Sequence, residues 1–381
     1  MRQHERGGSQ VKRNAVIFMN FCVVLAFAGP ISSATAQDGV VVAWGINFEG
    51  ELEVHQPNSG YVAICAGAGH SLAMKADGSI YGWGDDSYGQ ASPIPNQGYM
   101  AVAAGDHNSL ALRTNGSIFA WGESANGETN VPAPNSGFVA IAAGIFHSLG
   151  LKADGSVVAW QCPLFSPPCD VPAPNTGFVA ISAGYNHSVG LKADGSIVGW
   201  GGGPNVPPAN TGLGAISAGA FHTLALKSDG SIVAWGAGGP GQSGGIHHGQ
   251  SIVPEPNTGF VAVAAGWIHS LGHKSDGSIV AWGANNWGQC NVPAPNSGFV
   301  AISAGEDFSL GLKAVGVSLA TDAGAGVVLV SWTGGTASYT LRRSRNPQFT
   351  QDVVTLVDEQ NVTSHDDPVL NDGVTYYYEV Q

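Results

Sequence analysis

The sequence predicts an all-β protein: a seven-bladed β-propeller closed by pairing of its N- and C-terminal strands, followed by a partial β-sandwich. Three observations predict this fold. The composition is rich in glycine and poor in charge, a tryptophan-centred unit recurs along the chain, and each unit carries the same turn motif. Repeats of about 40 residues are typical of propellers and solenoids, in which one unit cannot bury its own apolar face.

The composition favours short strands over long helices. Glycine accounts for 56 of 381 residues and proline for 21, whereas charged residues make up only 11% and hydrophobic residues 44%. A chain with so few Glu, Lys and Arg lacks the side chains that cover exposed helix faces, but it can bury a core. We therefore expect many short strands joined by tight turns.

Residues 1–36 predict a secretory signal peptide. A basic segment precedes the apolar run Ala15–Ala28, and the small residues Ala34-Thr35-Ala36 follow it. This pattern predicts cleavage after Ala36 and a secreted, periplasmic or cell-surface protein without membrane insertion afterwards. An uncleaved anchor is the alternative, but the apolar run is short for a spanning helix, which takes roughly 20 residues.

The charge excludes nucleic acid as a partner. The whole chain carries −13, and residues 1–36 carry +3, so the remainder carries −16 and would repel a phosphate backbone. In the repeats each basic residue stands just before the turn motif, where we expect a solvated ring beside the turn acids. These residues are Lys75, Arg113, Lys152, Lys192, Lys227, Lys274 and Lys313.

Each unit predicts three antiparallel strands. In residues 137–160, FVAIAAG is the first strand, HSLGLK the second and SVVAWG the third. Asp-Gly or Asn-Gly between the second and third strands predicts a type I′ hairpin turn. The glycine that ends each first strand is expected where a side chain would obstruct a sharp turn. The recurring tryptophans are expected to pack between blades; they are Trp44, Trp83, Trp121, Trp160, Trp200, Trp235 and Trp282.

The two ends of the repeated part predict closure into a ring. It begins with a lone third strand, residues 39–45, and ends with a lone second strand, residues 309–313. Pairing of these two halves would complete one blade and remove the exposed edges of an open array.

The pattern AGxxHSLxLKxDGSIxAWG resembles the regulator of chromosome condensation repeat family. The short repeat spacing and the linker VPxPNxGFVAI are most similar in style to the secreted bacterial propeller that inhibits β-lactamases. The resemblance covers residues 38–314. It implies a propeller and, from the second likeness, an enzyme inhibitor. The nuclear members act on a small GTPase and chromatin, and an exported acidic chain is not expected to meet either.

Residues that vary between units predict a binding face. The two-residue turn after each first strand and the loop after each third strand vary, and strand direction places both at one end, which we call the top face. Its aromatic and acidic candidates are Phe48, Tyr88, Phe146, Tyr185, Phe221, Trp267, Trp287, Asp106, Glu306 and Asp307. Such a rim predicts a protein partner with a neutral or basic surface. Packing of loop against loop is the alternative.

Two other functions remain open: a propeller that binds or cleaves polysaccharide at the same face, and a passive cell-surface scaffold. Glycoside hydrolysis needs two carboxylates that flank the bond, and no such pair stands out, although Asp106, Glu306 and Asp307 are neighbours. We therefore expect no enzyme activity, no catalytic residues and no cofactor.

Histidine and cysteine give no strong metal motif. The histidines before the second-strand serine are replaced by Asn108 and Phe308 in two units, which favours a structural role satisfied by backbone hydrogen bonds. His247-His248 is expected to be exposed loop. The sequence contains no CxxC pair, so structural zinc is not expected. A local disulfide between Cys162 and Cys169 is expected, whereas Cys65 and Cys290 either pair or stay free.

Residues 315–381 lack the repeat. The segments VVLVSW, SYTLRRS and VTLVDEQ predict strands, and the ending LNDGVTYYYEV with Trp332 resembles a fibronectin type III domain. That resemblance implies that Trp332 is the core tryptophan and Tyr376 the corner tyrosine. The chain stops before the last strand of such a domain, so the module is expected to be incomplete and to act as a spacer. The predicted domains are thus residues 1–36, 37–314 and 315–381.

Overall fold

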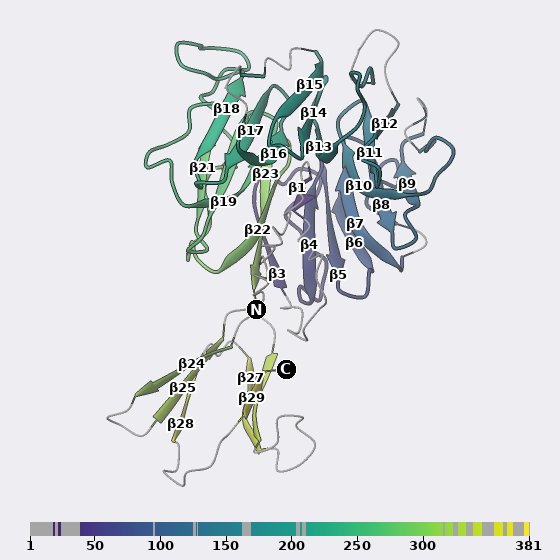
Figure 1. The fold of residues 1–381 in the computed structure, drawn as a ribbon. Coiled ribbons are helices and arrows are strands. Elements are labelled where there is room, and N and C mark those ends of the chain that lie inside the picture. Colours follow the sequence, from purple (N-terminus) through teal and green to yellow (C-terminus); the bar gives the residue numbers. More distant parts are fainter. Residues whose placement is uncertain are drawn as a thin grey trace, which may run out of the picture.

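The computed structural model describes residues 39–314 except 94–95, 125–126, 128, 162–168, 203–205 and 208–210, together with the backbone of short strands nearer the two ends. The described part is built of strands and turns without helices, and none of it could cross a membrane as a helix (Figure 1). The all-β prediction is confirmed for this part.

Three-stranded antiparallel blades follow one another along the chain (Figure 1). The first contains β4 (Tyr61–Ala66), β5 (His70–Lys75) and β6 (Ile80–Gly84). The next five are β7 (Tyr99–Ala104), β8 (Asn108–Arg113) and β9 (Ile118–Gly122); β10 (Phe138–Ala143), β11 (Ser148–Lys152) and β12 (Val157–Trp160); β13 (Phe178–Ala183), β14 (His187–Lys192) and β15 (Ile197–Gly201); β16 (Leu213–Ala218), β17 (His222–Lys227) and β18 (Ile232–Gly236); and β19 (Phe260–Ala265), β20 (His269–Lys274) and β21 (Ile279–Gly283).

A further sheet joins the two ends of the repeated part. β22 (Phe299–Ala304) pairs with β23 (Phe308–Ala314), and β23 pairs along its whole length with β3 (Gly39–Gly45). The first strands of successive blades contact one another, and β22 contacts β4. The first strands are therefore the innermost strands of the repeated part.

Two short strands precede the repeats. β1 (Phe18–Met19) pairs with β2 (Cys22–Val23), and β2 pairs with β4 so that Cys22 stands opposite Cys65. Figure 1 draws β1 among the blades. The predicted cleavage point after Ala36 lies outside the described residues, so the signal peptide stays a prediction.

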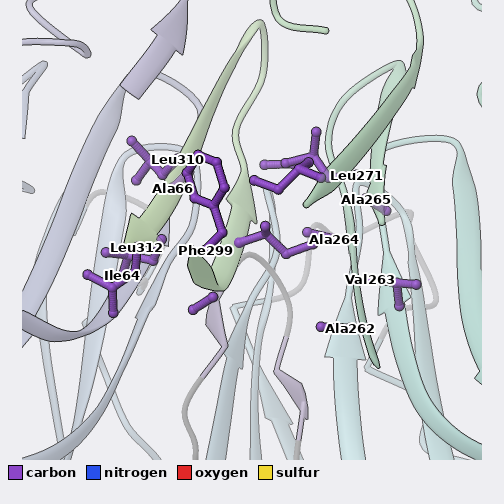
Figure 2. Packing of buried hydrophobic residues seen from close by; sticks show 14 of the residues in the cluster. Ile64, Ala66, Ala262, Val263, Ala264, Ala265, Leu271, Phe299, Leu310 and Leu312 are labelled. Carbon is purple, nitrogen blue, oxygen red and sulfur yellow. The ribbon is translucent and has the colours of Figure 1, made fainter. Parts of the chain in front are cut away.

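The recurring tryptophans join neighbouring blades, as predicted. All seven are buried, between 4% and 8% exposed. Trp121 Nε1 donates to the carbonyl of Gln90, 2.8 Å away in the loop of the preceding blade, and Trp44 donates to the carbonyl of Gln289 at 2.9 Å. Figure 2 shows the apolar packing between blades, with Phe299 of β22 among Leu271, Leu310 and Leu312.

The glycine at the end of each first strand leaves no room for a side chain, as predicted, but the closest obstruction comes mostly from the next blade. None of these glycines has a positive φ, so a sharp turn does not require them. A Cβ at Gly144 would instead lie 2.5 Å from the Gly184 carbonyl oxygen of the next blade and 2.9 Å from the His147 ring. The same clash with the next blade recurs for Gly67, Gly105, Gly184, Gly219, Gly266 and Gly305.

The buried histidines are structural, but their partners differ from the predicted backbone groups. The Nε2 atom of each lies 2.7–3.0 Å from a hydroxyl oxygen at the start of the next blade's second strand. The pairs are His70–Ser109, His147–Ser188, His187–Thr223, His222–Ser270 and His269–Ser309. Asn108 uses its side-chain amide in the same way toward Ser148, which explains why asparagine is tolerated.

The prediction of a type I′ turn is wrong. That turn needs positive φ at both central residues, but Gln161 is the only non-glycine with positive φ among the described residues. Gly78 has φ +78°, and its N–H donates to the Lys75 carbonyl, while the Lys75 N–H donates to the Ser79 carbonyl. Asp77 accepts from the N–H and hydroxyl of Ser79. The loop is therefore longer, with only glycine in the left-handed region.

The basic residues form more than a solvated ring. Lys152 Nζ lies 3.7 Å from the centroid of the Phe138 ring and donates to the Pro134 carbonyl at 3.0 Å. Cation–π contacts also occur at Lys75, Arg113, Lys192, Lys274 and Lys313. Each such side chain covers the aromatic residue that begins its blade.

The cysteines follow the prediction only in part. Cys290 is a free thiol, whereas Cys65 is disulfide-bonded, so these two do not pair with each other. Cys169 is disulfide-bonded too, and its predicted partner Cys162 lies outside the described residues.

Beyond the repeats, the backbone forms two antiparallel sheets (Figure 1). One contains β24 (Val317–Asp322), β25 (Val327–Trp332) and β28 (Ser364–Pro368); the other contains β26 (Ser338–Ser344), β27 (Val354–Gln360) and β29 (Tyr377–Val380). Trp332 ends β25, while Tyr376 lies outside the described residues. The fibronectin type III likeness stays a prediction.

Adding one methyl group at Gly144 is expected to destabilise the protein. The new Cβ must push two backbones apart, so Gly144→Ala should lower the free energy of unfolding by about 1–3 kcal/mol in urea titrations. Gly214 offers a matched control, because it lies in a first strand with negative φ and only the Leu226 carbonyl oxygen within 4 Å, at 3.9 Å. Gly214→Ala should be neutral or slightly stabilising; equal losses in both variants would refute the close-approach argument.

The buried histidines are expected to make stability pH-dependent. Burial lowers the pKa of His147 and of His222 from 6.5 to about 3, with a smaller contribution from neighbouring histidines. The unfolded chain binds protons below pH 6.5 that the folded chain does not, so stability is complete above that pH and falls toward pH 4. The free energy of unfolding should therefore depend less steeply on pH in His147→Asn, by about 1.4 kcal/mol per pH unit over this range.

Urea unfolding at a series of pH values measures the slope. Asparagine is the matched replacement, because Asn108 occupies the equivalent place in another blade. The control is Val139→Ala, which trims an exposed apolar side chain and removes no titratable group, so the slope should equal that of the wild type. An unchanged slope in His147→Asn would show that this histidine is not held neutral.

Candidate functional site

Backbone hydrogen bonds tie the variable turns to the variable loops. The first N–H after most third strands donates to the carbonyl of the second turn residue in the same blade. These bonds join Ile46 to Asp307, Asp85 to Gly69, Glu123 to His107, Ala237 to Phe221 and Ala284 to Ile268, over 2.8–3.0 Å. Turns and loops thus share one end of the blades, as strand direction predicts for the top face.

A buried glutamine holds several of these loops in place. Gln90, Gln250 and Gln289 are fully buried, and each accepts a backbone N–H of its own loop. Gln289 Nε2 also donates to Asp307 Oδ1 at 2.8 Å. The backbone carbonyls of these glutamines accept hydrogen bonds from the tryptophan Nε1 and the serine hydroxyl of the next blade. The Gly-Gln dipeptide in the loops was the sequence signal for this role, and the sequence reasoning missed it.

Four of the predicted aromatic residues form one cluster, the aromatic quartet: Phe146, Tyr185, Phe221 and Trp267. They come from the first-to-second-strand turns of four successive blades. Tyr185 is central, with its ring centroid 5.0 Å from Phe146, 5.4 Å from Phe221 and 5.7 Å from Trp267. Phe146 is 38% exposed and the other three are half-buried, so the cluster presents rings to solvent.

The other three aromatic candidates lie in loops, outside the quartet. Phe48 and Trp287 contact each other edge to face with ring centroids 5.3 Å apart, and Tyr88 packs against His107 at 5.0 Å. Phe48 is 72% exposed, Tyr88 52% and Trp287 48%. Contact between loops therefore occurs, but it leaves these rings largely accessible.

The three predicted acids gather where the last blade meets the first two. Glu306 is half-buried, and burial, with Asp307, Asp106 and Glu51 nearby, raises the pKa of its carboxyl to about 7. Burial also raises the pKa of Asp106 and that of Asp307. The turn of the intervening blade carries only Ala68 and Gly69, and Asp106 is near enough to Glu306 to contribute to this rise of its pKa. Like charges thus accumulate here, with His107 as a nearby base 3.7 Å from Asp106 and His248 near Asp307.

A narrow pocket opens among the first turn residues, and we call it the mouth pocket. It is lined by Ile145, Tyr185, Ala220, Trp267 and Glu306, with the strand-ending glycines beneath. Its volume is about 10 Å³, which is room for a single water molecule. The surface that lines it is almost entirely apolar. Ile145 and Ala220 were not among the predicted residues, because a single aliphatic turn residue gives no functional signal.

The described residues contain no cluster of three or more His, Cys, Asp or Glu side chains that could hold a metal ion. His247 and His248 instead stabilise their own loop: His247 Nδ1 accepts the Gly238 N–H at 3.0 Å, and His248 Nε2 lies 2.7 Å from the Gly245 carbonyl oxygen.

Comparisons with known proteins give relatives of the repeat and of the fold. The model of the regulator of chromosome condensation (RCC1) repeat matches residues 61–90, 101–128, 178–205 and 215–242. Prp20p from Saccharomyces cerevisiae is similar in structure, with a TM-score of 0.59 and 18% identity over 74% of this chain and 93% of that one. Human WBSCR16 has a TM-score of 0.54 and 17% identity over 72% and 99% of the two chains.

The ectodomain of the receptor kinase CR4 from Physcomitrella patens is also similar, with a TM-score of 0.51 and 24% identity over 63% of this chain and 66% of that chain. At these identities the likenesses concern the fold. The four matched segments are similar to the RCC1 repeat, and the solved structures show the shared fold.

Proposed function

We propose that this chain is an exported, non-enzymatic propeller that binds a protein partner through its top face. The observation that carries the proposal is the aromatic quartet, which remains partly exposed beside three carboxyl groups. Blade packing does not require aromatic residues here, because other blades carry Ala68, Gly69 and Asp106 at the same places. Exposed aromatic residues clustered on one face are typical of protein interfaces.

The finer architecture belongs to the same proposal. We infer seven blades closed into a ring, supported by the pairing of β3 with β23 and by the approach of Gly305 to the Gly67 carbonyl oxygen. A signal peptide over residues 1–36, a propeller over 37–314 and a fibronectin type III-like spacer over 315–381 complete it. The two antiparallel sheets after the propeller support a sandwich of that kind.

Relatives of this fold support a protein as the partner. Prp20p is described together with its binding to Gsp1p and histones, and it shares the fold with this chain. The likeness in repeat style to the secreted inhibitor of β-lactamases suggests one mode of action, in which the top face covers the active site of an enzyme. An acidic top face favours a partner with a neutral or basic surface.

Replacing two rings of the quartet is expected to abolish binding without unfolding the protein. The double variant Tyr185→Ala/Trp267→Ala removes rings that contact each other, so the affinity for the partner should fall about 100-fold or more. The partner is first captured from the native exported fraction with the mature chain, and its dissociation constant is then measured by calorimetry.

Val139→Ala/Val261→Ala is the matched control, because these side chains are 41% and 42% exposed and lie in first strands, away from the top face. The control should bind like the wild type. Unchanged affinity in Tyr185→Ala/Trp267→Ala would refute the top-face proposal, and the absence of any captured partner would favour a passive scaffold.

Polysaccharide is the second candidate ligand. The raised pKa of Glu306 beside two other carboxyl groups favours it, since glycosidases pair a protonated acid with an ionised carboxylate. We nevertheless expect no turnover in a polysaccharide hydrolysis screen and no selective binding on a glycan array. Hydrolysis that disappears in Glu306→Gln would replace the binding proposal with an enzymatic one.

A further inference from the structure

We propose that the end of the blades opposite the top face carries a second binding site, which takes an aromatic side chain of a partner protein beneath Lys227. The site is a hollow where the fifth blade begins, and residues of the fourth and sixth blades also border it. We call it the lysine hollow; its lining includes Val179, Lys192, Leu213, Gly214, Lys227 and Val261. It shares no residue with the three carboxyl groups or the aromatic quartet of the top face.

Six units pair a basic residue with an aromatic ring of their own sheet. The first residue of the first strand stands opposite the last residue of the second strand, as Phe178 does with Lys192. In these six units the cation lies 3.5–5.8 Å from the centroid of that ring. Since the contact recurs so regularly, the geometry of this position favours a ring beneath the cation.

The fifth blade has the cation without the ring. Leu213 stands opposite Lys227 in the pairing of β16 with β17. Lys227 is half-buried, and among the described residues it contacts no aromatic ring and donates no hydrogen bond. Its ammonium group is therefore available to a ring that comes from outside the chain.

Two replacements in β16 open the space beside this lysine. Leu213 is smaller than the tyrosine or phenylalanine that begins the other first strands, and Gly214 replaces the valine or methionine that follows. A Cβ at Gly214 would have only the Leu226 carbonyl oxygen within 4 Å, at 3.9 Å. The hollow that results has a volume of about 1010 Å³.

The size of the hollow favours a side chain of a protein over a free aromatic molecule. A cavity of about 150 Å³ is enough for a benzene ring, so the lysine hollow has room for a ring and for the chain on both sides of it. Val261 is 42% exposed at its border and offers apolar contact to such a chain. An aromatic anchor in a pocket with apolar contacts around it is typical of protein interfaces.

The charges of the hollow favour a neutral ring over an anion. Its charged lining consists of two lysines and two aspartates, namely Lys192, Lys227, Asp194 and Asp229. Lys192 already lies over the Phe178 ring, with its Nζ 3.5 Å from the centroid. Both aspartates are fixed in hairpin turns, where they accept hydrogen bonds from serine. A carboxylate ligand would be repelled by these two carboxylates, whereas an uncharged ring would not.

Peptide titration tests the contact between ring and cation. The probes are acetyl-Gly-Gly-Phe-Gly-Gly-amide and its cyclohexylalanine and aspartate analogues, titrated into the mature chain while the Gly214 amide NMR signal is followed. Cyclohexylalanine keeps the apolar bulk of phenylalanine but has no π face. We expect the phenylalanine peptide to bind about threefold or more tightly than either analogue. Equal or tighter binding of the cyclohexylalanine peptide, or tighter binding of the aspartate peptide, would refute the proposal.

A change at the lysine tests the cation alone. Lys227→Met keeps an apolar stem and removes the charge, so the phenylalanine peptide should bind it no better than the cyclohexylalanine peptide does. Lys152→Met is the matched control, because Lys152 covers Phe138 of its own blade and lies outside the hollow. That control should bind the peptide like the wild type. Unchanged binding in Lys227→Met, or equal losses in both variants, would contradict the role of Lys227.

A ring supplied by the chain itself should close the site. In Leu213→Tyr the new ring would lie opposite Lys227 and take the place of the ligand. Tyrosine suits this blade, because Ala225 occupies the position of Ala73 and Ala111 in the two blades that begin with tyrosine. Peptide binding should disappear while urea titrations show that the fold is kept. Undiminished binding in this variant would exclude the hollow as the site.

The quartet variant separates this site from the top face. Tyr185→Ala/Trp267→Ala should bind the phenylalanine peptide as the wild type does, since both rings lie at the other end of the blades. Loss of peptide binding in that variant would place the peptide at the top face. This outcome would refute the second site and leave the proposed function standing.

Discussion

Where the first strands of neighbouring blades converge, the space between them admits no side chain. A Cβ at Gly184 would lie 2.3 Å from the Gly219 carbonyl oxygen, and one at Gly305 would lie 2.7 Å from that of Gly67. Backbone N–H groups cross the same boundaries, as from Ala68 to the Gly105 carbonyl at 3.1 Å. The spacing of the first strands depends on this contact. The positions of the outer strands follow from it, because each second strand pairs with a first strand and each third strand pairs with a second strand.

The polar groups buried next to these glycines fix the angle between blades. Histidine packs against its own glycine and reaches the hydroxyl of the next blade, and that hydroxyl commonly donates to the carbonyl of a buried glutamine. The same carbonyl accepts from tryptophan, so one loop atom binds two side chains of the neighbouring blade. Buried polar groups are costly unless they are paired. A blade that rotated would therefore break several of these hydrogen bonds at once.

The sequence predicted the strands, the tryptophan contacts and the common face of turns and loops, because each depends on a local pattern that recurs. It did not predict what a side chain at Gly144 would meet or which group His147 contacts, since both involve atoms of the next blade, about 40 positions away in the chain. The type I′ prediction failed because Asp-Gly was taken as the whole turn, whereas Lys75 and Ser79 close a longer loop. The sequence placed Glu306 near Asp106, but its raised pKa depends on burial that only the folded chain shows.

The same geometry explains why a few variable residues can make a binding face. Each residue that follows a strand-ending glycine is held at the narrow centre of the top face, so its side chain meets those of other blades. Tyr185 and Trp267 touch although a whole blade separates them in the chain, because that blade contributes only Ala220 at the equivalent position. Small residues such as Ala68 and Ala220 thus leave space in which larger side chains from other blades can contact one another. Aromatic residues gather on the turns of four successive blades and carboxyl groups on the turns of others, although the blades beneath them are nearly identical.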